Sequence, residues 1–483
     1  MTTFPAVRSR YPLIASLLCL CHLVACNAQT DSDSPRVSTS QQDSADQSVN
    51  AADRPNLPPV KTAAGGSDWP RLLGKDFDGV APVEGMQLDW SVQPQVAWEL
   101  PVGDGYGLGA VADGVYYQFD ASRDGGQMVE RLRALKIENA EPIWSVNRPL
   151  NYRDMYGYES GPRGTPAIQG DSIVTFGVSG ELCCRAVQNG ELRWSVDTRL
   201  KYGVVQNFFG VAASPLIWND RVIVPVGGSP AEDQKIAPGR LDRVISNGSA
   251  VVAFDLHNGQ ELWRCGQDLA SYSSPRTMQI GSQTIVLQFA RDHLLAIDPE
   301  HGKVLWKQPH RADIVESVNA ILPIVDADRI FISECYQVGS LLLKATPTDS
   351  EIVWQDPPQN RREQSMRCHW STPLLIDGFL YGCSGRNNPD SDFRCVEFAT
   401  GKVRWVDERR IRTSVTRVAD KVIVWDEIGR MQIIRPNPER LDVVAEYDFT
   451  DLVSSPCWAA PIVVGNRMLI RGDEKVVCLA IAD

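Results

Sequence analysis

Short runs in which apolar and polar residues alternate recur along the chain from about residue 67 to the C-terminus. The most regular of these segments join two such runs through a turn and end in tryptophan. They read ALKIENAEPIW, CRAVQNGELRW, AFDLHNGQELW, AIDPEHGKVLW and CVEFATGKVRW. Alternation with a period of two on both sides of an Asn/Gly-type turn is typical of a β-hairpin. Each segment therefore predicts a pair of antiparallel strands.

The terminal tryptophans mark a repeat. They are Trp144, Trp194, Trp263, Trp306, Trp354 and Trp405, with spacings of 50, 69, 43, 48 and 51 residues. A second hairpin precedes most of them and opens with Ser/Thr-Pro, as in TPAIQGDSIVTFG, SPLIWNDRVIVPVG, SPRTMQIGSQTIVLQF and TPLLIDGFLYGCSG. Proline is tolerated where a strand begins, because the ladder does not need its N–H there. Two hairpins form a four-stranded unit, and a period of about 40–50 residues is typical of a β-propeller.

The ends of the repeat region predict how the ring closes. A weaker copy places Ala445 at the tryptophan position, and the final segment, APIVVGNRMLIRGDEKVVCLAIAD, supplies only three strands. A strand containing Trp98, in QVAWELPV, precedes the first complete unit. Pairing this strand with the last three would remove exposed sheet edges. We therefore expect an all-β, eight-bladed propeller of four-stranded antiparallel blades, closed by an N-terminal strand and spanning residues 67–483.

The repeat A-x-D-x-x-x-G-x-x-x-W, most complete in AFDLHNGQELW, resembles that of the quinoprotein-like, or PQQ-like, repeat propellers. The resemblance covers roughly residues 68–483. It is nearest to the lipoprotein branch typified by the propeller subunit of the outer-membrane β-barrel assembly machinery. The resemblance is specific for architecture and says less about function, because one fold hosts many activities.

The N-terminal residues predict export and anchoring. Arg8 and Arg10 precede an apolar run from Leu13 to Ala25, which is too short to cross a bilayer as a helix and has the form of a signal peptide. The run ends in LVAC, which resembles the lipobox of bacterial lipoproteins, where the cysteine is acylated. We therefore expect a signal peptide over residues 1–25 and lipidation of Cys26. An ordinary signal peptide beside a cysteine is the alternative.

The segment after Cys26 predicts a tether. Residues 27–66 are rich in Ser, Asp, Gln, Ala and Pro and contain no aromatic residue, so they bury too little apolar surface to order themselves. Residues 26–66 are therefore expected to be an acylated cysteine followed by a disordered linker. In lipoproteins, Asp after the cysteine favours the inner membrane, and Asn27 stands there instead. We expect an outer-membrane lipoprotein of the cell envelope that faces the periplasm.

Composition and charge exclude some partners. The chain is 43% apolar and 22% charged, which suits a large folded core, and its formal net charge is −12. Loss of Arg8 and Arg10 with the signal peptide would make this −14. A surplus of acidic residues opposes nucleic-acid binding, which requires Lys and Arg. We expect no nucleic-acid partner.

The adjacent Cys183 and Cys184 have two interpretations. Methanol-dehydrogenase-like quinoproteins share the repeat and carry a vicinal disulfide beside the quinone, which would suit an enzyme. However, Cys184 lies ten residues before Trp194, the same offset as Ala253 from Trp263, and Cys395 and Cys478 occupy that repeat position too. We favour a small packing residue at this position. The cysteines of the propeller are then expected to be mostly buried free thiols.

The longer connections predict one functional face. In a propeller whose strands run A to D within each blade, the B–C loops and the connections from strand D to the next strand A share one side. The long segments 147–164, 228–248, 309–320, 356–371 and 384–393 all fall there. Candidate binding residues on this face are Tyr158, Glu159, Arg163, Glu316, Asn319, Arg367, His369, Trp370, Arg386, Arg412 and Trp458. Convergent Arg, aromatic and carboxylate groups suit a peptide or an anionic ligand.

These patterns favour a non-catalytic, lipid-anchored periplasmic scaffold that binds protein partners, with a role in envelope assembly implied by the resemblance. No helix carries two histidines at metal-binding spacing, no phosphate-binding glycine loop occurs, and no Cys-x-x-Cys-His is present. We therefore expect no catalytic residues, no metal and no cofactor. Two alternatives use the same funnel: a PQQ-dependent dehydrogenase, and a sensor of carbohydrate or another small ligand.

Overall fold

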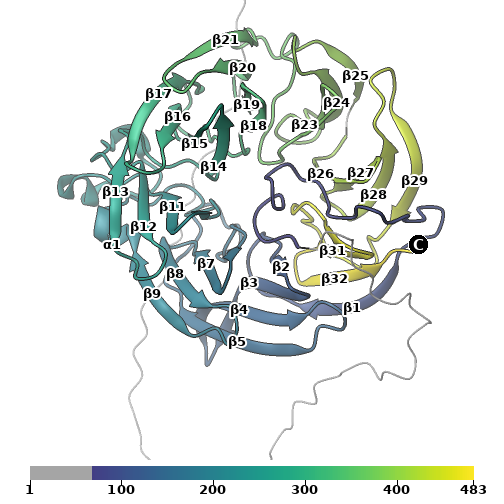
Figure 1. Cartoon of the computed structure of the whole chain (residues 1–483), viewed down its shortest axis with the longest axis horizontal. Helices are drawn as coiled ribbons and strands as arrows, with labels where there is room; N and C mark the ends of the chain where they lie inside the picture. Colours follow the sequence, from purple (N-terminus) through teal and green to yellow (C-terminus); the bar gives the residue numbers. More distant parts are fainter. Residues whose placement is uncertain (1–67, 409, 483) are drawn as a thin grey trace, which may run out of the picture. The chain divides into compact units, whose positions relative to one another are not determined.

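A computed structural model describes residues 68–408 and 410–482, which form a ring of eight four-stranded antiparallel sheets (Figure 1). The predicted all-β, eight-bladed propeller is confirmed. The signal peptide, Cys26 and the linker predicted for residues 1–66 lie outside the described residues. No helix in the described part is long and apolar enough to cross a membrane.

Seven blades are each built from four consecutive strands. The first three are β2 (Ala110–Ala112), β3 (Val115–Asp124), β4 (Gln127–Lys136) and β5 (Pro142–Pro149); β6 (Ala167–Gln169), β7 (Ser172–Phe176), β8 (Glu181–Ala186) and β9 (Leu192–Asp197); and β10 (Leu216–Trp218), β11 (Arg221–Pro225), β12 (Val251–Asp255) and β13 (Glu261–Cys265). The next two are β14 (Arg276–Ile280), β15 (Gln283–Phe289), β16 (His293–Asp298) and β17 (Lys303–Pro309); and β18 (Ile324–Asp326), β19 (Arg329–Glu334), β20 (Gly339–Ala345) and β21 (Ser350–Gln355). The last two are β22 (Leu374–Ile376), β23 (Phe379–Ser384), β24 (Asp392–Glu397) and β25 (Val403–Asp407); and β26 (Thr413–Val418), β27 (Lys421–Asp426), β28 (Arg430–Arg435) and β29 (Asp442–Asp448).

The eighth blade joins the two ends of the described chain. Its strands β30 (Ile462–Val464), β31 (Arg467–Arg471) and β32 (Lys475–Ala480) are followed in the sheet by β1 (Gln95–Pro101). Within it, Trp98 pairs with Cys478 across the β1–β32 ladder. The predicted closure by an N-terminal strand is therefore confirmed. Short helical segments are α1 (Thr198–Tyr202), η2 (Ala231–Lys235) and η3 (Leu241–Arg243).

The repeated tryptophan links each blade to the next. Its indole N–H donates to a backbone carbonyl in the C–D turn of the following blade, as Trp194 Nε1 does to Leu256 O at 2.7 Å. The other six links are Trp98 to Ile137, Trp144 to Val187, Trp263 to Pro299, Trp306 to Thr346, Trp354 to Phe398 and Trp405 to Asn437, at 2.8–3.2 Å. Ala445 has no indole. Beside it, the Tyr447 hydroxyl donates instead to Trp90 O in the segment before β1.

The glycine of the repeat makes room for the preceding tryptophan. Gly259 has a φ of +71°, and a Cβ added there would lie 2.7 Å from the Trp194 ring. Gly302 stands in the same relation to Trp263, and Gly401 to Trp354. The glycine therefore serves both the turn, which needs a left-handed residue, and the contact between blades.

The small residue of the repeat lies opposite its own tryptophan. Cys184 pairs with Trp194 and Cys395 with Trp405, and both cysteines have no exposed surface. Cys183 points to the other face of β8 and is also buried. All nine cysteines in the described residues are buried and free. The predicted packing role of Cys184, Cys395 and Cys478, and the predicted buried free thiols, are confirmed.

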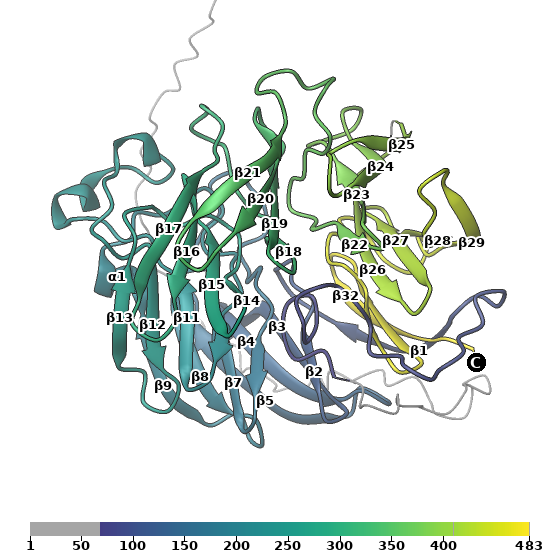
Figure 2. The ribbon, with the colours of Figure 1, turned by 45° about the horizontal axis from the view of Figure 1, so that its top comes forward.

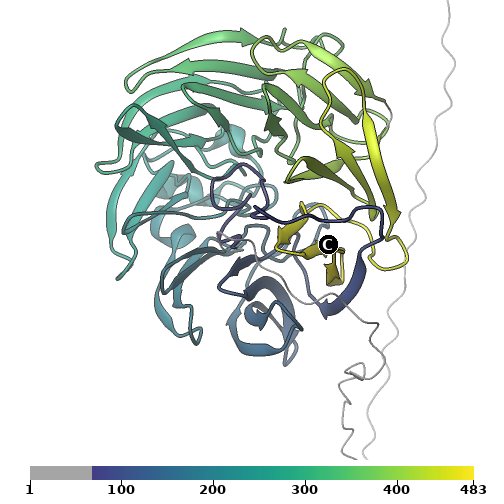
Figure 3. The same ribbon diagram turned by 45° about the vertical axis from the view of Figure 1, so that its right-hand side comes forward.

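The chain that precedes β1 crosses the ring on the side of the A–B turns (Figures 1 and 3). Trp69 forms a bridge with Val111 beside β2, and Arg276 of β14 donates to Phe77 O at 3.2 Å. Farther along, Val80 pairs with Arg417 of β26. This segment therefore contacts blades on different sides of the ring and covers one end of the central channel.

Candidate binding site

The centre of the ring holds a cavity of about 290 Å³. Each of the eight connections between the outer strand of one blade and the inner strand of the next contributes to its lining in the described chain. They supply Tyr106, Arg163, Phe209, Tyr272, Val318, Trp370, Arg412 and Trp458, among others. Trp69, Leu72 and Leu73 of the crossing segment form the far end. Because the crossing segment covers the other end, the cavity faces the side predicted to carry the long loops.

The Ser/Thr-Pro motifs surround this pocket and tie the blades together there. Thr165 N donates to Ser214 Oγ, and Ser214 N donates to Ser274 Oγ, both at 2.8 Å. Leu322 N donates to Thr372 Oγ1 at 3.0 Å. The hydroxyls thus accept hydrogen bonds from backbone N–H groups that lie just before the prolines, outside the strand ladders. These bonds position the starts of adjacent inner strands.

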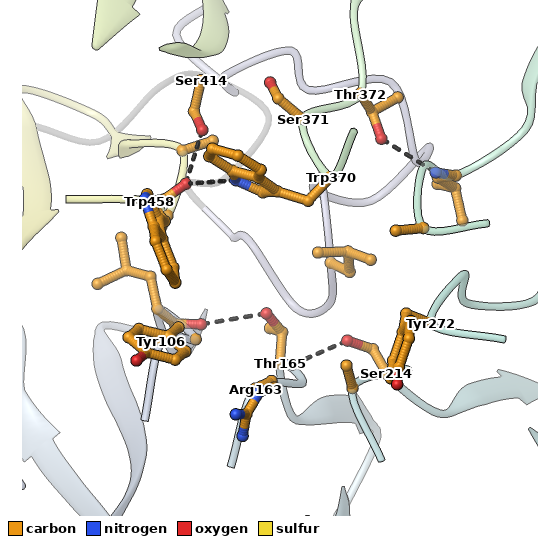
Figure 4. A pocket seen from close by; sticks show the side chains of 18 of the residues that line it. Tyr106, Arg163, Thr165, Ser214, Tyr272, Trp370, Ser371, Thr372, Ser414 and Trp458 are labelled. Atoms are coloured by element: carbon orange, nitrogen blue, oxygen red, sulfur yellow. Dashed lines mark hydrogen bonds between the residues drawn. The ribbon is translucent and has the colours of Figure 1, made fainter. Parts of the chain in front are cut away.

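One wall of the pocket is a cluster of aromatic rings that includes Tyr106, Trp370 and Trp458 (Figure 4). Trp370 and Trp458 have centroids 5.5 Å apart, and Tyr106 lies 4.6 Å from Trp458. The Arg412 guanidinium lies over both tryptophans, at 4.6 and 5.1 Å. Glu427 accepts from Arg412 Nε at 2.9 Å and from Trp458 Nε1 at 3.0 Å. The cation and the rings are therefore positioned before any ligand arrives.

The opposite wall is also aromatic. Tyr272 lies 5.6 Å from Phe209, and Tyr158 meets Phe209 edge-on at 5.6 Å. Figure 4 shows Tyr272 across the opening from the two tryptophans. Arg163 enters between these walls, where it pairs with Asp154 at 3.0 Å and lies over the Tyr106 ring at 5.3 Å. Both arginines of the pocket thus have a carboxylate partner.

His369 provides a neutral polar group at the pocket. Burial lowers the pKa of His369 to about 3, and the nearby Arg412 and Arg386 act in the same direction. Its Nε2 lies 3.4 Å from the Tyr336 hydroxyl, whereas its Nδ1 has no hydrogen-bond partner. The imidazole is therefore neutral, and its unpartnered Nδ1 is itself buried.

Glu159 lies beside the pocket wall and does not line it. Its Oε2 accepts from Gly105 N at 2.5 Å, and its backbone N–H donates to the Tyr106 hydroxyl at 3.1 Å. Burial raises the pKa of Glu159 to about 8, and a hydrogen bond with Asp473 acts in the same direction. Glu159 therefore supports the loop that carries Tyr106.

The structure brings six of the predicted residues together in the pocket lining and places the others elsewhere. The six are Tyr158, Arg163, His369, Trp370, Arg412 and Trp458. Arg367 is buried and pairs with Asp390 at 3.0 Å, and Asn319 is buried and donates to the carbonyls of Ala290, Arg291 and His310. Arg386 lies over the Tyr336 ring at 4.9 Å, and Glu316 is exposed. Arg367 and Asn319 thus shape loops.

Sequence reasoning missed Tyr106, Phe209, Tyr272 and Trp69. Tyr106, Phe209 and Tyr272 have only their place as a signal, because each stands shortly before the inner strand of a blade, where the repeat directs the chain toward the axis. Trp69 lies before the first repeat unit, and nothing in the repeat indicates that this segment returns to the channel.

The predicted loop 228–248 is ordered and does not line the pocket. It contains η2 and η3 and lies next to α1 (Figure 2), where Asn247 Nδ2 donates to Tyr202 O at 2.9 Å. Leu241 is buried in a cluster with Phe208, Tyr272 and Val318. The loop therefore supports the pocket wall from behind.

The residues of the pocket do not suit a quinone with a bound metal ion. Such a quinone carries several carboxylates, and both pocket arginines are already paired with protein carboxylates. No Asp or Glu lines the pocket, and no group of three or more His, Cys, Asp or Glu in the described chain is placed to hold a metal ion. Cys183 and Cys184 are separate thiols outside the lining.

The sequence is similar to known proteins. A family model described as "Outer membrane protein assembly factor BamB" matches residues 215–407. Uncharacterized protein RP232 of Rickettsia prowazekii (strain Madrid E) is 19% identical over 337 residues, which is 67% of this chain and 73% of that protein.

Among solved structures, a europium-containing methanol dehydrogenase is 10% identical, with a TM-score of 0.63 over 86% of this chain and 98% of its own. BamB from Moraxella catarrhalis is 15% identical, with a TM-score of 0.49 over 76% of this chain and 97% of its own. At these identities the likeness concerns the fold. The tryptophan repeat, the ring of eight blades and the family-model match together support a fold of the PQQ-like repeat β-propeller type.

Proposed function

We propose that this protein is a non-catalytic binding propeller that engages protein partners at the pocket mouth and is tethered in the cell envelope through Cys26. One observation carries the proposal: all eight blade connections converge on a preorganised aromatic pocket whose cations are already neutralised. Such a site has the apolar and aromatic character of interface hot spots.

The rim of the pocket adds exposed apolar surface. Tyr156 and Tyr158 are 54% and 45% exposed, and both contact Phe209. Aromatic side chains that stay exposed beside a cleft are typical of protein-binding surfaces. The match to a family described as an outer-membrane assembly factor supports a protein-binding role in the envelope. It also supports the outer-membrane, periplasm-facing location predicted from LVAC and Asn27.

Photo-cross-linking in the native membrane tests this proposal. A photoreactive phenylalanine would replace Tyr156 at the rim or, as a control, Asn258, which is exposed in a C–D turn on the opposite face. We expect discrete cross-linked protein species from position 156 and none of these from position 258. Equal patterns from both positions, or none from either, would contradict a partner-binding mouth.

A further inference from the structure

The pocket has the size of one large aromatic side chain. Its volume is about 290 Å³. A buried apolar cavity of about 150 Å³ is enough to hold benzene. The space is therefore large enough for a fused two-ring group such as an indole.

The charges around the pocket favour an uncharged ligand. Arg163 pairs with Asp154, and Arg412 pairs with Glu427 at 2.5–2.9 Å. An anion would have to compete with these carboxylates, whereas a cation would find no carboxylate in the lining. His369 remains neutral, because burial holds its pKa far below neutrality. A charged ligand would thus lose its hydration without gaining a free partner.

The walls favour a flat ring. The Trp370, Trp458 and Tyr106 rings lie on one side and Tyr272 on the other (Figure 4), and Phe209 contacts Tyr272. Aromatic pairs at such separations add to the free energy of burial.

Apolar surface continues from the pocket onto the neighbouring loops, which favours a polypeptide over a free small molecule. Tyr158 and Tyr156 lead outward, and Met155 beside them is 39% exposed. Gly239 of loop 228–248 lies next to Met155, because a Cβ added at Gly239 would contact the Met155 side chain. The same loop carries Ile245, which is 67% exposed. Tyr156, Tyr158, Met155 and Ile245 form an exposed apolar strip beside the pocket. A polypeptide that inserts one side chain into the pocket would cover this strip with the residues that flank that side chain.

We propose that the pocket receives one uncharged aromatic side chain, most favourably tryptophan, presented by an extended segment of a partner polypeptide. This inference rests on the proposed function and specifies the chemistry that the mouth recognises. The fit of volume, charge and ring placement carries it.

Saturation-transfer NMR on the full-length protein tests the inference with defined peptides. We expect acetyl-SGWGS-amide to bind with a dissociation constant of roughly 1 mM or below, as burial of one large side chain allows. The same peptide with aspartate in place of tryptophan should not bind detectably. Free indole should bind at least about fivefold more weakly, because it cannot cover the strip.

Two alanine-to-phenylalanine variants locate the binding site. Ala212 lines the pocket, so Ala212→Phe should fill it and weaken binding of acetyl-SGWGS-amide at least about tenfold. Ala231 is exposed in η2 outside the lining, so Ala231→Phe should leave binding unchanged. If Ala212→Phe does not fold, Trp458→Ala should give the same loss by removing one wall.

The other outcomes would overturn the inference. Tighter binding of the aspartate peptide would refute the neutral pocket, and equal binding of free indole would refute a polypeptide ligand. Peptide binding unaffected by both pocket variants would place the site elsewhere. If no peptide binds while position 156 still cross-links to a partner, this inference fails and the proposed function stands. If neither occurs, both fail.

Discussion

The contact between the repeat glycine and the preceding tryptophan makes a quantitative prediction. Gly259 adopts a φ of +71°, and an added Cβ would lie 2.7 Å from the Trp194 ring. Gly281, in the A–B turn between β14 and β15, adopts a φ of +61° and has nothing within 4 Å of its added Cβ. The two positions share the backbone requirement, and only Gly259 has the contact with tryptophan.

The cost of each substitution follows from this difference. A left-handed conformation costs an alanine about 1–2 kcal/mol, so Gly281→Ala should lower the free energy of unfolding by about that much. Gly259→Ala should lower it by a further 1–3 kcal/mol, roughly, because the methyl group would overpack the interface between two blades. In a Trp194→Ala background this additional cost should disappear, although Trp194→Ala alone costs about 3–5 kcal/mol.

Urea unfolding of the four variants, followed by far-UV circular dichroism, measures these differences. Circular dichroism is preferred because tryptophan fluorescence would itself change in the Trp194→Ala background. Equal free energies of unfolding for Gly259→Ala and Gly281→Ala would refute the steric explanation of the repeat glycine. So would an undiminished cost of Gly259→Ala when Trp194 is absent.

Four further results are expected. Asp120→Asn should cost about 3 kcal/mol or more in the free energy of unfolding, measured by urea unfolding, because the fully buried carboxylate accepts from two arginines. Cys183 and Cys184 should resist maleimide in the native protein and react after unfolding, as peptide mass spectrometry can follow, because burial raises their pKa values to about 12 and 11; rapid native labelling would contradict this. The raised pKa of Glu159 favours its protonated form in the folded state, so stability should fall as pH rises from about 4.5 to 8, and urea midpoints across that window should fall less for Glu159→Gln. Cys26→Ser should move the protein from the membrane to the soluble fraction and abolish fatty-acid labelling; retention of the label would refute lipidation at this position.

The fold was predictable because the repeat encodes contacts between blades. The tryptophan, the small residue opposite it and the turn glycine recur at fixed spacings, and each spacing corresponds to a contact. The blade that carries Ala445 at the tryptophan position could also be predicted, as a weaker copy of the repeat. What the spacing does not reveal is the substitute contact, in which Tyr447 bonds to Trp90 from a distant part of the sequence.

The pocket was predictable only in part, because its residues come from connections that differ in length and carry no repeat. Arg412, Trp370 and Trp458 could be assigned to the right face from strand order. Whether a loop arginine faces the channel, as Arg163 does, or is buried against a neighbouring loop, as Arg367 is by its pairing with Asp390, depends on backbone details that the sequence pattern leaves open.

The pairing of β1 with β32 has a consequence for how the chain is made. Gln95 lies opposite Ala480, so one of the first strands of the propeller to be synthesised must wait for one of the last. Contacts so distant in sequence form late and slow the search for the native state. Until the ribosome releases the C-terminal residues, the eighth blade cannot form, and the first and seventh blades each lack a neighbour. A chain truncated before β32 should therefore expose two open blade faces to chaperones and proteases rather than form a shorter ring.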